Sequence, residues 1–150
     1  MTILVVEDDE NKRERVVQSI RDLAPGASIV TARSLRSGLE QVIGGQFDLI
    51  FMDMTMPTYD ISTEEDGGRF QAYAGREILR QMDRRGIRAP VVICTQYDSF
   101  GEGNERLTVI ELDEQLRRSH SGNYRGFIFY SASAEAWKEH LARYLKEGSK

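Results

Sequence analysis

Acidic side chains stand directly after two short apolar runs in the first third of the chain. Glu7, Asp8 and Asp9 follow one run, and Asp53 follows another. Carboxylates at close range repel one another unless a cation lies between them. Oxygen ligands with room for water suit a hard divalent ion, and Mg²⁺ more than Ca²⁺. A plainer interpretation stays open, in which Asp8 and Asp9 only begin the helix that follows.

The elements that must position these acids follow from the hydrophobic pattern. Five short apolar runs alternate with segments of helical periodicity, and four of the runs are nearly unbroken, as in strands covered by helices on both faces. The runs lie at 3–6, 28–31, 47–52, 90–94 and 127–130. This alternation predicts an α/β fold with a doubly wound five-stranded parallel sheet, (βα)5. The carboxyl ends of such strands share one edge, which would bring Thr95 to the same crevice as the acids.

Length and composition limit the function classes. The 150 residues suit a single domain, and a net charge of −4 without a dense basic face argues against direct nucleic-acid binding. Cys94 is the only cysteine, so an internal disulfide is excluded and a reducing compartment is favoured. No run approaches the roughly 18 apolar residues of a membrane span. We therefore expect a cytoplasmic protein without a membrane partner.

Three segments together resemble the receiver domain of two-component response regulators. They are ILVVEDD at 3–9, DLIFMDMTMP at 48–57 and VVICT at 91–95. The resemblance spans nearly the whole chain in the same order and spacing, and it requires three separate strand ends to agree. It implies a flavodoxin-like receiver fold over 1–150 as one domain, acting in phosphorelay signal transduction.

The resemblance also implies roles for individual residues. Asp53 matches the phosphoacceptor, and Glu7 and Asp8 match the acidic pair that holds Mg²⁺. Thr55 would add its main-chain carbonyl to the metal, and Thr95 matches the switch hydroxyl that binds the phosphoryl group. The metal would offset the charge that keeps the acceptor carboxylate and a phosphoryl oxygen apart.

Two positions near the implied site depart from the family pattern. Receivers carry a lysine at the end of the fifth strand, and Tyr130 stands there instead, without a positive charge near neutral pH. Gln96 follows Thr95 where a small residue is usual, so it would gate the pocket or simply face solvent. Lys12, Arg13 and Arg125 are candidates to replace the missing cation.

The segment 58–74 is longer than a receiver needs, and we interpret it as an inserted acidic loop. It contains Asp60, Glu64, Glu65 and Asp66 and no basic residue between them. A flexible lid or a docking loop is one interpretation, and a solvated surface loop is the other. Acidic residues beside the site would attract Mg²⁺ and repel a phosphoryl donor.

The leading hypothesis is a receiver that takes a phosphoryl group from a histidine kinase or phosphotransfer protein onto Asp53. It would signal to an unknown output protein, or form a homodimer, through helices at 105–119 and 133–146 and the strand at 127–130. Such a protein is not a conventional turnover enzyme, although it would dephosphorylate itself. The alternative is a pseudo-receiver that works by protein contact with little or no phosphorylation. A hydrolase ranks lower because no general acid is evident.

Overall fold

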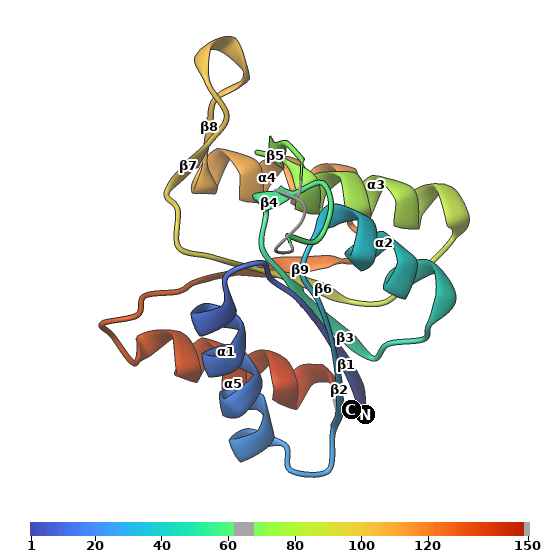
Figure 1. Cartoon of the computed structure of the whole chain (residues 1–150), viewed down its shortest axis with the longest axis vertical. Coiled ribbons are helices and arrows are strands. Elements are labelled where there is room, and N and C mark those ends of the chain that lie inside the picture. The colour runs from blue at the N-terminus through green and yellow to red at the C-terminus, as the bar shows by residue number, and fades with distance from the viewer. Residues whose placement is uncertain (62–67, 149–150) are drawn as a thin grey trace.

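The computed structural model describes residues 1–61 and 68–148. Its centre is a five-stranded parallel sheet in the order β2-β1-β3-β6-β9 (Figure 1). The strands are β1 (Thr2–Val6), β2 (Ser28–Ala32), β3 (Leu49–Met52), β6 (Val91–Thr95) and β9 (Tyr124–Phe129). The sheet order and the helical crossovers confirm the predicted doubly wound α/β fold.

Helices cover both faces of the sheet. Helices α1 (Glu10–Leu23) and α5 (Ala136–Gly148) pack on one face, while α2 (Leu35–Gly44), α3 (Ala74–Arg85) and α4 (Val109–Ser119) cover the other (Figure 1). No helix among the described residues is long and apolar enough to cross a bilayer.

Alternate side chains of β1, β3 and β6 enter two separate cores. In β1, Ile3 and Val5 pack into the core under α1 and α5, while Leu4 and Val6 pack into the core under α2, α3 and α4. Successive strand residues point to opposite faces, so a strand covered on both faces is apolar throughout. Trp137 is among the largest buried side chains of the α1/α5 core, which makes it a packing residue.

The hydrogen-bond ladder continues one residue beyond β1 and β3. The Glu7 N–H donates to the carbonyl of Ala32 at 2.9 Å, and the Asp53 N–H donates to the carbonyl of Val6 at 3.1 Å. Main-chain bonds therefore hold both acids at the edge of the sheet.

The inserted segment follows the first strand of a hairpin and contains the second, so the expectation of a loop over all of 58–74 is wrong only near its end. Strands β4 (Met56–Pro57) and β5 (Phe70–Gln71) pair antiparallel, and α3 already begins at the last residue of the segment. The sequence did not predict this hairpin, because each of its strands has only two residues.

Among the acids of the insertion, Asp60 belongs to the described residues. The Asp60 carboxylate accepts hydrogen bonds from the hydroxyls of Ser34 and Ser37, both at 2.7 Å, at the start of α2. Glu64, Glu65 and Asp66 lie outside the described residues. In the described part, the insertion is thus bonded to the helix beside it.

A second hairpin follows β6. Strands β7 (Ser99–Phe100) and β8 (Leu107–Thr108) pair antiparallel around a short turn at Gly103–Glu105, and the hairpin extends away from the sheet (Figure 1). The helix expected from residue 105 begins only at Val109. Its start is set by a capping box, in which the Thr108 hydroxyl accepts from the Glu111 N–H at 3.1 Å and the Glu111 carboxylate accepts from the Thr108 N–H at 2.9 Å.

Gly75 brings α3 against the loop that carries Asp53, and we predict that Gly75→Ala is destabilising. Its N–H donates to the Met54 carbonyl at 3.0 Å, and an added Cβ would meet the Asp53 carbonyl oxygen at 2.8 Å. Overpacking against main chain should lower the free energy of unfolding by about 1–3 kcal/mol in a denaturant titration.

Gly44→Ala is the matched control for this prediction, because a Cβ there meets no atom within 4 Å. Alanine is favoured over glycine in a helix by roughly 0.5–1 kcal/mol, so this variant should be as stable as the wild type or more so. Equal losses in the two variants would contradict the close approach at Gly75.

Candidate functional site

Three carboxylates meet at the carboxyl edge of the sheet. Glu7, Asp8 and Asp53 each offer an oxygen, and these oxygens all lie within 4.8 Å of one another. Glu7 and Asp53 are each 3% exposed, and Asp8 is half-buried. The structure therefore brings together the acids that the sequence placed at two separate strand ends.

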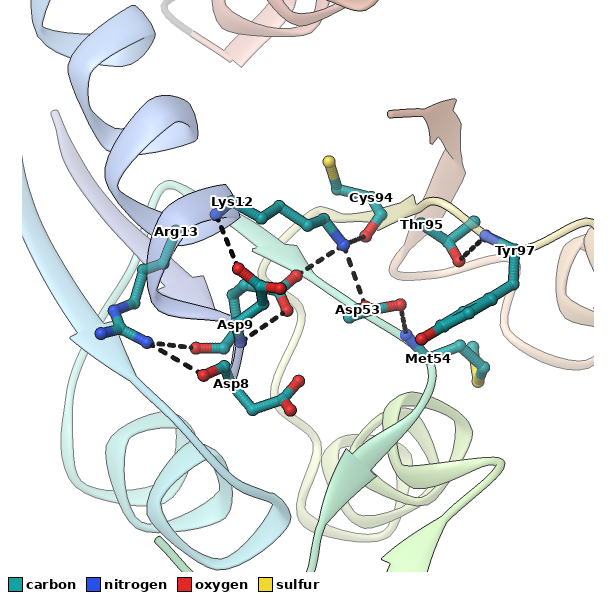
Figure 2. Close-up of polar contacts among 10 residues, drawn as sticks. Asp8, Asp9, Lys12, Arg13, Asp53, Met54, Cys94, Thr95 and Tyr97 are labelled. Atoms are coloured by element: carbon teal, nitrogen blue, oxygen red, sulfur yellow. Dashed lines mark hydrogen bonds and ion pairs between the residues drawn. The ribbon is translucent and has the colours of Figure 1, made fainter. Parts of the chain in front are cut away.

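The ammonium of Lys12 lies within this cluster. Its Nζ is 2.6 Å from Glu7 Oε1 and 2.9 Å from Asp53 Oδ2, and it donates to the Cys94 carbonyl at 2.8 Å (Figure 2). An ammonium has three N–H donors, so each of them has an acceptor here. Lys12 is 3% exposed and is the buried counterion of the two buried acids.

The turn between β1 and α1 orients this lysine. Asp9 is the N-cap of α1, and its carboxylate accepts from the Lys12 N–H at 2.9 Å. The Asp9 N–H donates to Glu7 Oε2 at 3.1 Å. Arg13 Nη1 donates to the main-chain carbonyls of Glu7 at 2.9 Å and Asp8 at 3.4 Å. The two acids after Glu7 thus have different local roles, because Asp9 caps the helix while Asp8 joins the carboxylate cluster.

Burial and charge act in opposite directions on these groups. Burial raises the pKa of the Glu7 carboxyl, and the Lys12 ammonium opposes that rise. Burial also raises the pKa of Asp8. Burial alone would lower the pKa of Lys12, but the neighbouring carboxylates of Asp53 and Glu7 outweigh it, so the pKa of Lys12 is raised. One ammonium against three carboxylates leaves an excess of negative charge in the cluster when all are ionised.

Thr95 and Gln96 differ in their surroundings although they are adjacent. Thr95 is fully buried at the end of β6, and its Oγ1 accepts from the Tyr97 N–H at 3.1 Å (Figure 2). A hydroxyl that accepts in this way still has its own proton to donate. Gln96 is exposed to solvent.

Tyr130 belongs to the core beneath α1 and α5. Its ring packs on Trp137 with centroids 5.0 Å apart, and its hydroxyl accepts from Arg15 Nη1 at 3.1 Å. The ammonium of Lys12 stands 5.6 Å from the centroid of the same ring. The residue at the end of the fifth sheet strand therefore forms a wall beside the lysine and supplies no charge of its own.

Thr55 connects the site to the insertion. It is half-buried, and its hydroxyl donates to the Ala72 carbonyl at 3.0 Å. The side chain is thus engaged with the chain beyond β5, and only the main-chain carbonyl of Thr55 is expected as a metal ligand. The clustered carboxylates offer only oxygen, which is the donor type that suits a hard divalent cation such as Mg²⁺.

From the sequence, Lys12 was only one of three candidate cations. Its spacing from the apolar residues of α1 could have distinguished it from the other two. Lys12 stands four and eight residues before Val16 and Ile20, so it shares their buried face of α1. Arg13 instead bonds the β1–α1 turn, and Arg125 is exposed and donates to the carbonyl of the preceding residue at 3.4 Å.

Comparison with known proteins finds response regulators by sequence and by structure. The family model described as "Response regulator receiver domain" matches residues 3–116. The Detocs response regulatory protein DtcB of Enterobacter cloacae is 27% identical over 147 residues, covering 96% of this chain and 98% of that protein. The uncharacterized protein y4jR of Sinorhizobium fredii is 29% identical over 140 residues, covering 92% of each.

Solved structures share the same fold. A Francisella response regulator receiver domain superimposes with a TM-score of 0.62 at 18% identity, covering 99% of this chain and 98% of that one. The response regulator TrrA of Thermotoga maritima, solved in complex with Mg²⁺-BeF, gives 0.59 at 20% identity, covering 95% and 96%. The fold is therefore that of these regulators along nearly the full chain.

The buried ion pairs of Lys12 lead to a testable energetic coupling. Lys12→Met leaves Glu7 and Asp53 buried without their counterion, so the free energy of unfolding should fall by about 3–5 kcal/mol. The same change in a Glu7→Gln background should cost less, because one of the two buried charges is gone. Denaturant titrations of the four proteins measure this coupling.

Lys138→Met is the control for the loss of a lysine at the surface. Lys138 pairs with Glu135 at 2.6 Å on the exposed side of α5 and should contribute little. Additive losses for Lys12→Met and Glu7→Gln would show that the two side chains are not coupled in the folded protein.

Proposed function

Since the chain belongs to the family of response regulator receiver domains, we propose that it accepts a phosphoryl group on the carboxylate of Asp53. The observation that carries this proposal is the position of Asp53. It lies at the carboxyl edge of the sheet, beside two further acids and one ammonium. This arrangement concentrates charge around one carboxylate, and open α/β sheets build their sites at this edge.

The proposed step is attack by an Asp53 oxygen on the phosphorus of a phosphohistidine donor. An O–P bond forms, the P–N bond breaks, and the electron pair of that bond goes to the imidazole nitrogen. The product is an acyl phosphate on Asp53. The Met54 N–H donates to Asp53 Oδ1 at 2.7 Å, and Lys12 Nζ donates to Oδ2 at 2.9 Å. These two contacts hold the nucleophile in one orientation before the donor arrives.

The residues at this edge fit Mg²⁺, and we propose that the ion is held by Glu7, Asp8, Asp53 and the carbonyl of Thr55. When bound, it would neutralise negative charge between the acceptor carboxylate and the phosphoryl oxygens. The excess of carboxylate over ammonium in the cluster supports this assignment. The Thermotoga relative solved with Mg²⁺-BeF is in keeping with it.

For partners, we propose a histidine kinase or a phosphotransfer protein as donor and a separate output protein as target. Ile110 on α4 is 57% exposed and Phe129 on β9 is 48% exposed. These two apolar side chains favour the surface of α4, β9 and α5 for output or for a homodimer. Trp137 is buried and contributes nothing to that surface. We further propose that the protein acts in the cytoplasm as a switch and not as an enzyme that turns over a substrate.

A pseudo-receiver is the competing proposal, and the replacement of the strand-end lysine by Tyr130 is the observation that favours it. In that case the acids would be a structural remnant, and the hairpins or the surface of α4 and β9 would act by contact alone. The retained group of Glu7, Asp8, Asp53 and buried Thr95 favours phosphorylation instead, because contact alone does not require it.

Phosphorylation is tested by mass. The full chain, incubated with Mg²⁺ and acetyl phosphate, should gain the mass of one phosphoryl group in intact-protein mass spectrometry. Asp53→Ala should gain none, whereas Asp98→Ala, in the exposed segment after β6, should behave like the wild type. If neither a small donor nor a cognate kinase gives an Asp53-dependent gain, the pseudo-receiver is the better account.

Magnesium binding is tested by thermal stability. A ligand that binds only the folded protein raises the melting temperature by mass action, so millimolar Mg²⁺ should stabilise the wild type. Asp8→Ala should abolish the rise, because it removes one of the three clustered carboxylates. Asp22→Ala, on the exposed side of α1, is the control that should keep it. An unchanged melting temperature of the wild type would count against the metal site.

A further inference from the structure

The end of β9 offers no charge to an incoming phosphoryl group. The Tyr130 hydroxyl already accepts a hydrogen bond from Arg15, and its ring packs on Trp137. A carboxylate and a phosphoryl group are both anionic, so they approach one another only where positive charge offsets their repulsion. A bound Mg²⁺ would offset part of this repulsion, and a positive side chain that adds to it must come from a part of the chain other than the end of β9.

We infer that Lys12 supplies it from helix α1 and is the cation that binds the phosphoryl group on Asp53. This inference rests on the proposed phosphorylation of Asp53. The ammonium is 2.9 Å from Asp53 Oδ2, an oxygen of the proposed acceptor carboxylate. The ammonium is thus already bound to the carboxylate that would carry the phosphoryl group.

The other basic residues near the site have different partners. Arg13 donates to the main-chain carbonyls of Glu7 and Asp8, and Arg15 donates to the Tyr130 hydroxyl and, at 2.8 Å, to the Ala132 carbonyl. The chain has lysines only at positions 12, 138, 146 and 150. Among the described residues, Lys12 alone forms an ion pair with Asp53.

The side chains of Tyr130 and Lys12 are in contact with each other. An aromatic ring at the strand end fills the space beneath α1, and its face lies 5.6 Å from the Lys12 ammonium. A cation is stabilised over an aromatic face, more strongly where water is excluded. Tyr130, which stands at the position of the usual lysine, therefore helps to hold Lys12 in place.

Lys12 also forms an ion pair with a second carboxylate, that of Glu7, and this contact can be replaced. Its contact with Glu7 Oε1 at 2.6 Å satisfies the ammonium before any phosphoryl group is present. A phosphoryl group on Asp53 brings new anionic oxygens, and a bound Mg²⁺ would take over part of the charge of Glu7. The ammonium can then change partners from Glu7 to phosphoryl oxygen without losing an ionic contact.

The test compares initial rates of Asp53-dependent mass gain with acetyl phosphate and Mg²⁺. Lys12→Met should be slower than the wild type by about 100-fold or more, the usual effect of removing one donor from a developing anion. Lys138→Met should match the wild type, because that lysine pairs with Glu135 on the surface. Circular dichroism establishes that each variant is folded under the assay conditions.

A second measurement is made on the wild type, and a variant is used only to assign its signals. Lysine side-chain ¹H–¹⁵N spectra of the wild type are recorded with Mg²⁺, before and after adding beryllofluoride, which imitates a phosphoryl group on a carboxylate. The Lys12 ammonium signal, assigned by its loss in Lys12→Arg, should shift, while that of Lys138 stays.

The outcomes separate the two proposals. If the wild type is phosphorylated and folded Lys12→Met reacts at the same rate, or if the Lys12 signal does not move with beryllofluoride, the role of Lys12 is overturned and the phosphoacceptor role of Asp53 stands. If the wild type takes no phosphoryl group from small donors or a cognate kinase, the proposed function fails, and the role of Lys12 fails with it.

Discussion

Repulsion among carboxylates is the constraint on which the rest of this site depends. The parallel sheet places the ends of β1 and β3 side by side, so the carboxylates of Glu7, Asp8 and Asp53 lie close together. The ammonium of Lys12 offsets part of that charge from inside the cluster. Its position follows from the start of α1, where Asp9 caps the helix and Lys12 occupies the first turn. The carboxylate cluster, its counterion and the first helix are therefore one structural unit.

The segment that follows the first hairpin is hydrogen-bonded to the second hairpin. The Tyr73 hydroxyl, just before α3, donates to the Phe100 carbonyl at 3.0 Å and also contacts the carbonyl of Glu105. A groove of about 950 Å³ lies between the hairpins and α3 and includes Thr55 in its lining. The Thr55 hydroxyl donates to the carbonyl of Ala72 in the insertion. Through Thr55, the groove reaches the segment that follows Asp53.

The sequence was sufficient for the parts of the structure that strong periodicity determines. Unbroken apolar runs predicted the sheet, and the acids after two of those runs predicted the cluster, because parallel strands end at one edge. The hairpins could not be predicted in this way, since each of their strands has only two residues, too few to show a period. Lys12 was an intermediate case. Its spacing from Val16 and Ile20 marks the buried face of α1, but a buried lysine is rare enough that the pattern alone left Arg13 and Arg125 open.

The central claim of this account is that a lysine on the first helix has taken over the task of the strand-end lysine. A crystal structure of the full chain with Mg²⁺ and beryllofluoride on Asp53 tests it most directly. If Lys12 has this role, its Nζ lies within hydrogen-bond distance of a fluorine atom while Tyr130 keeps its place against Trp137. A fluoride group that meets Tyr130 or Arg15, with Lys12 still bound only to Glu7, would contradict it.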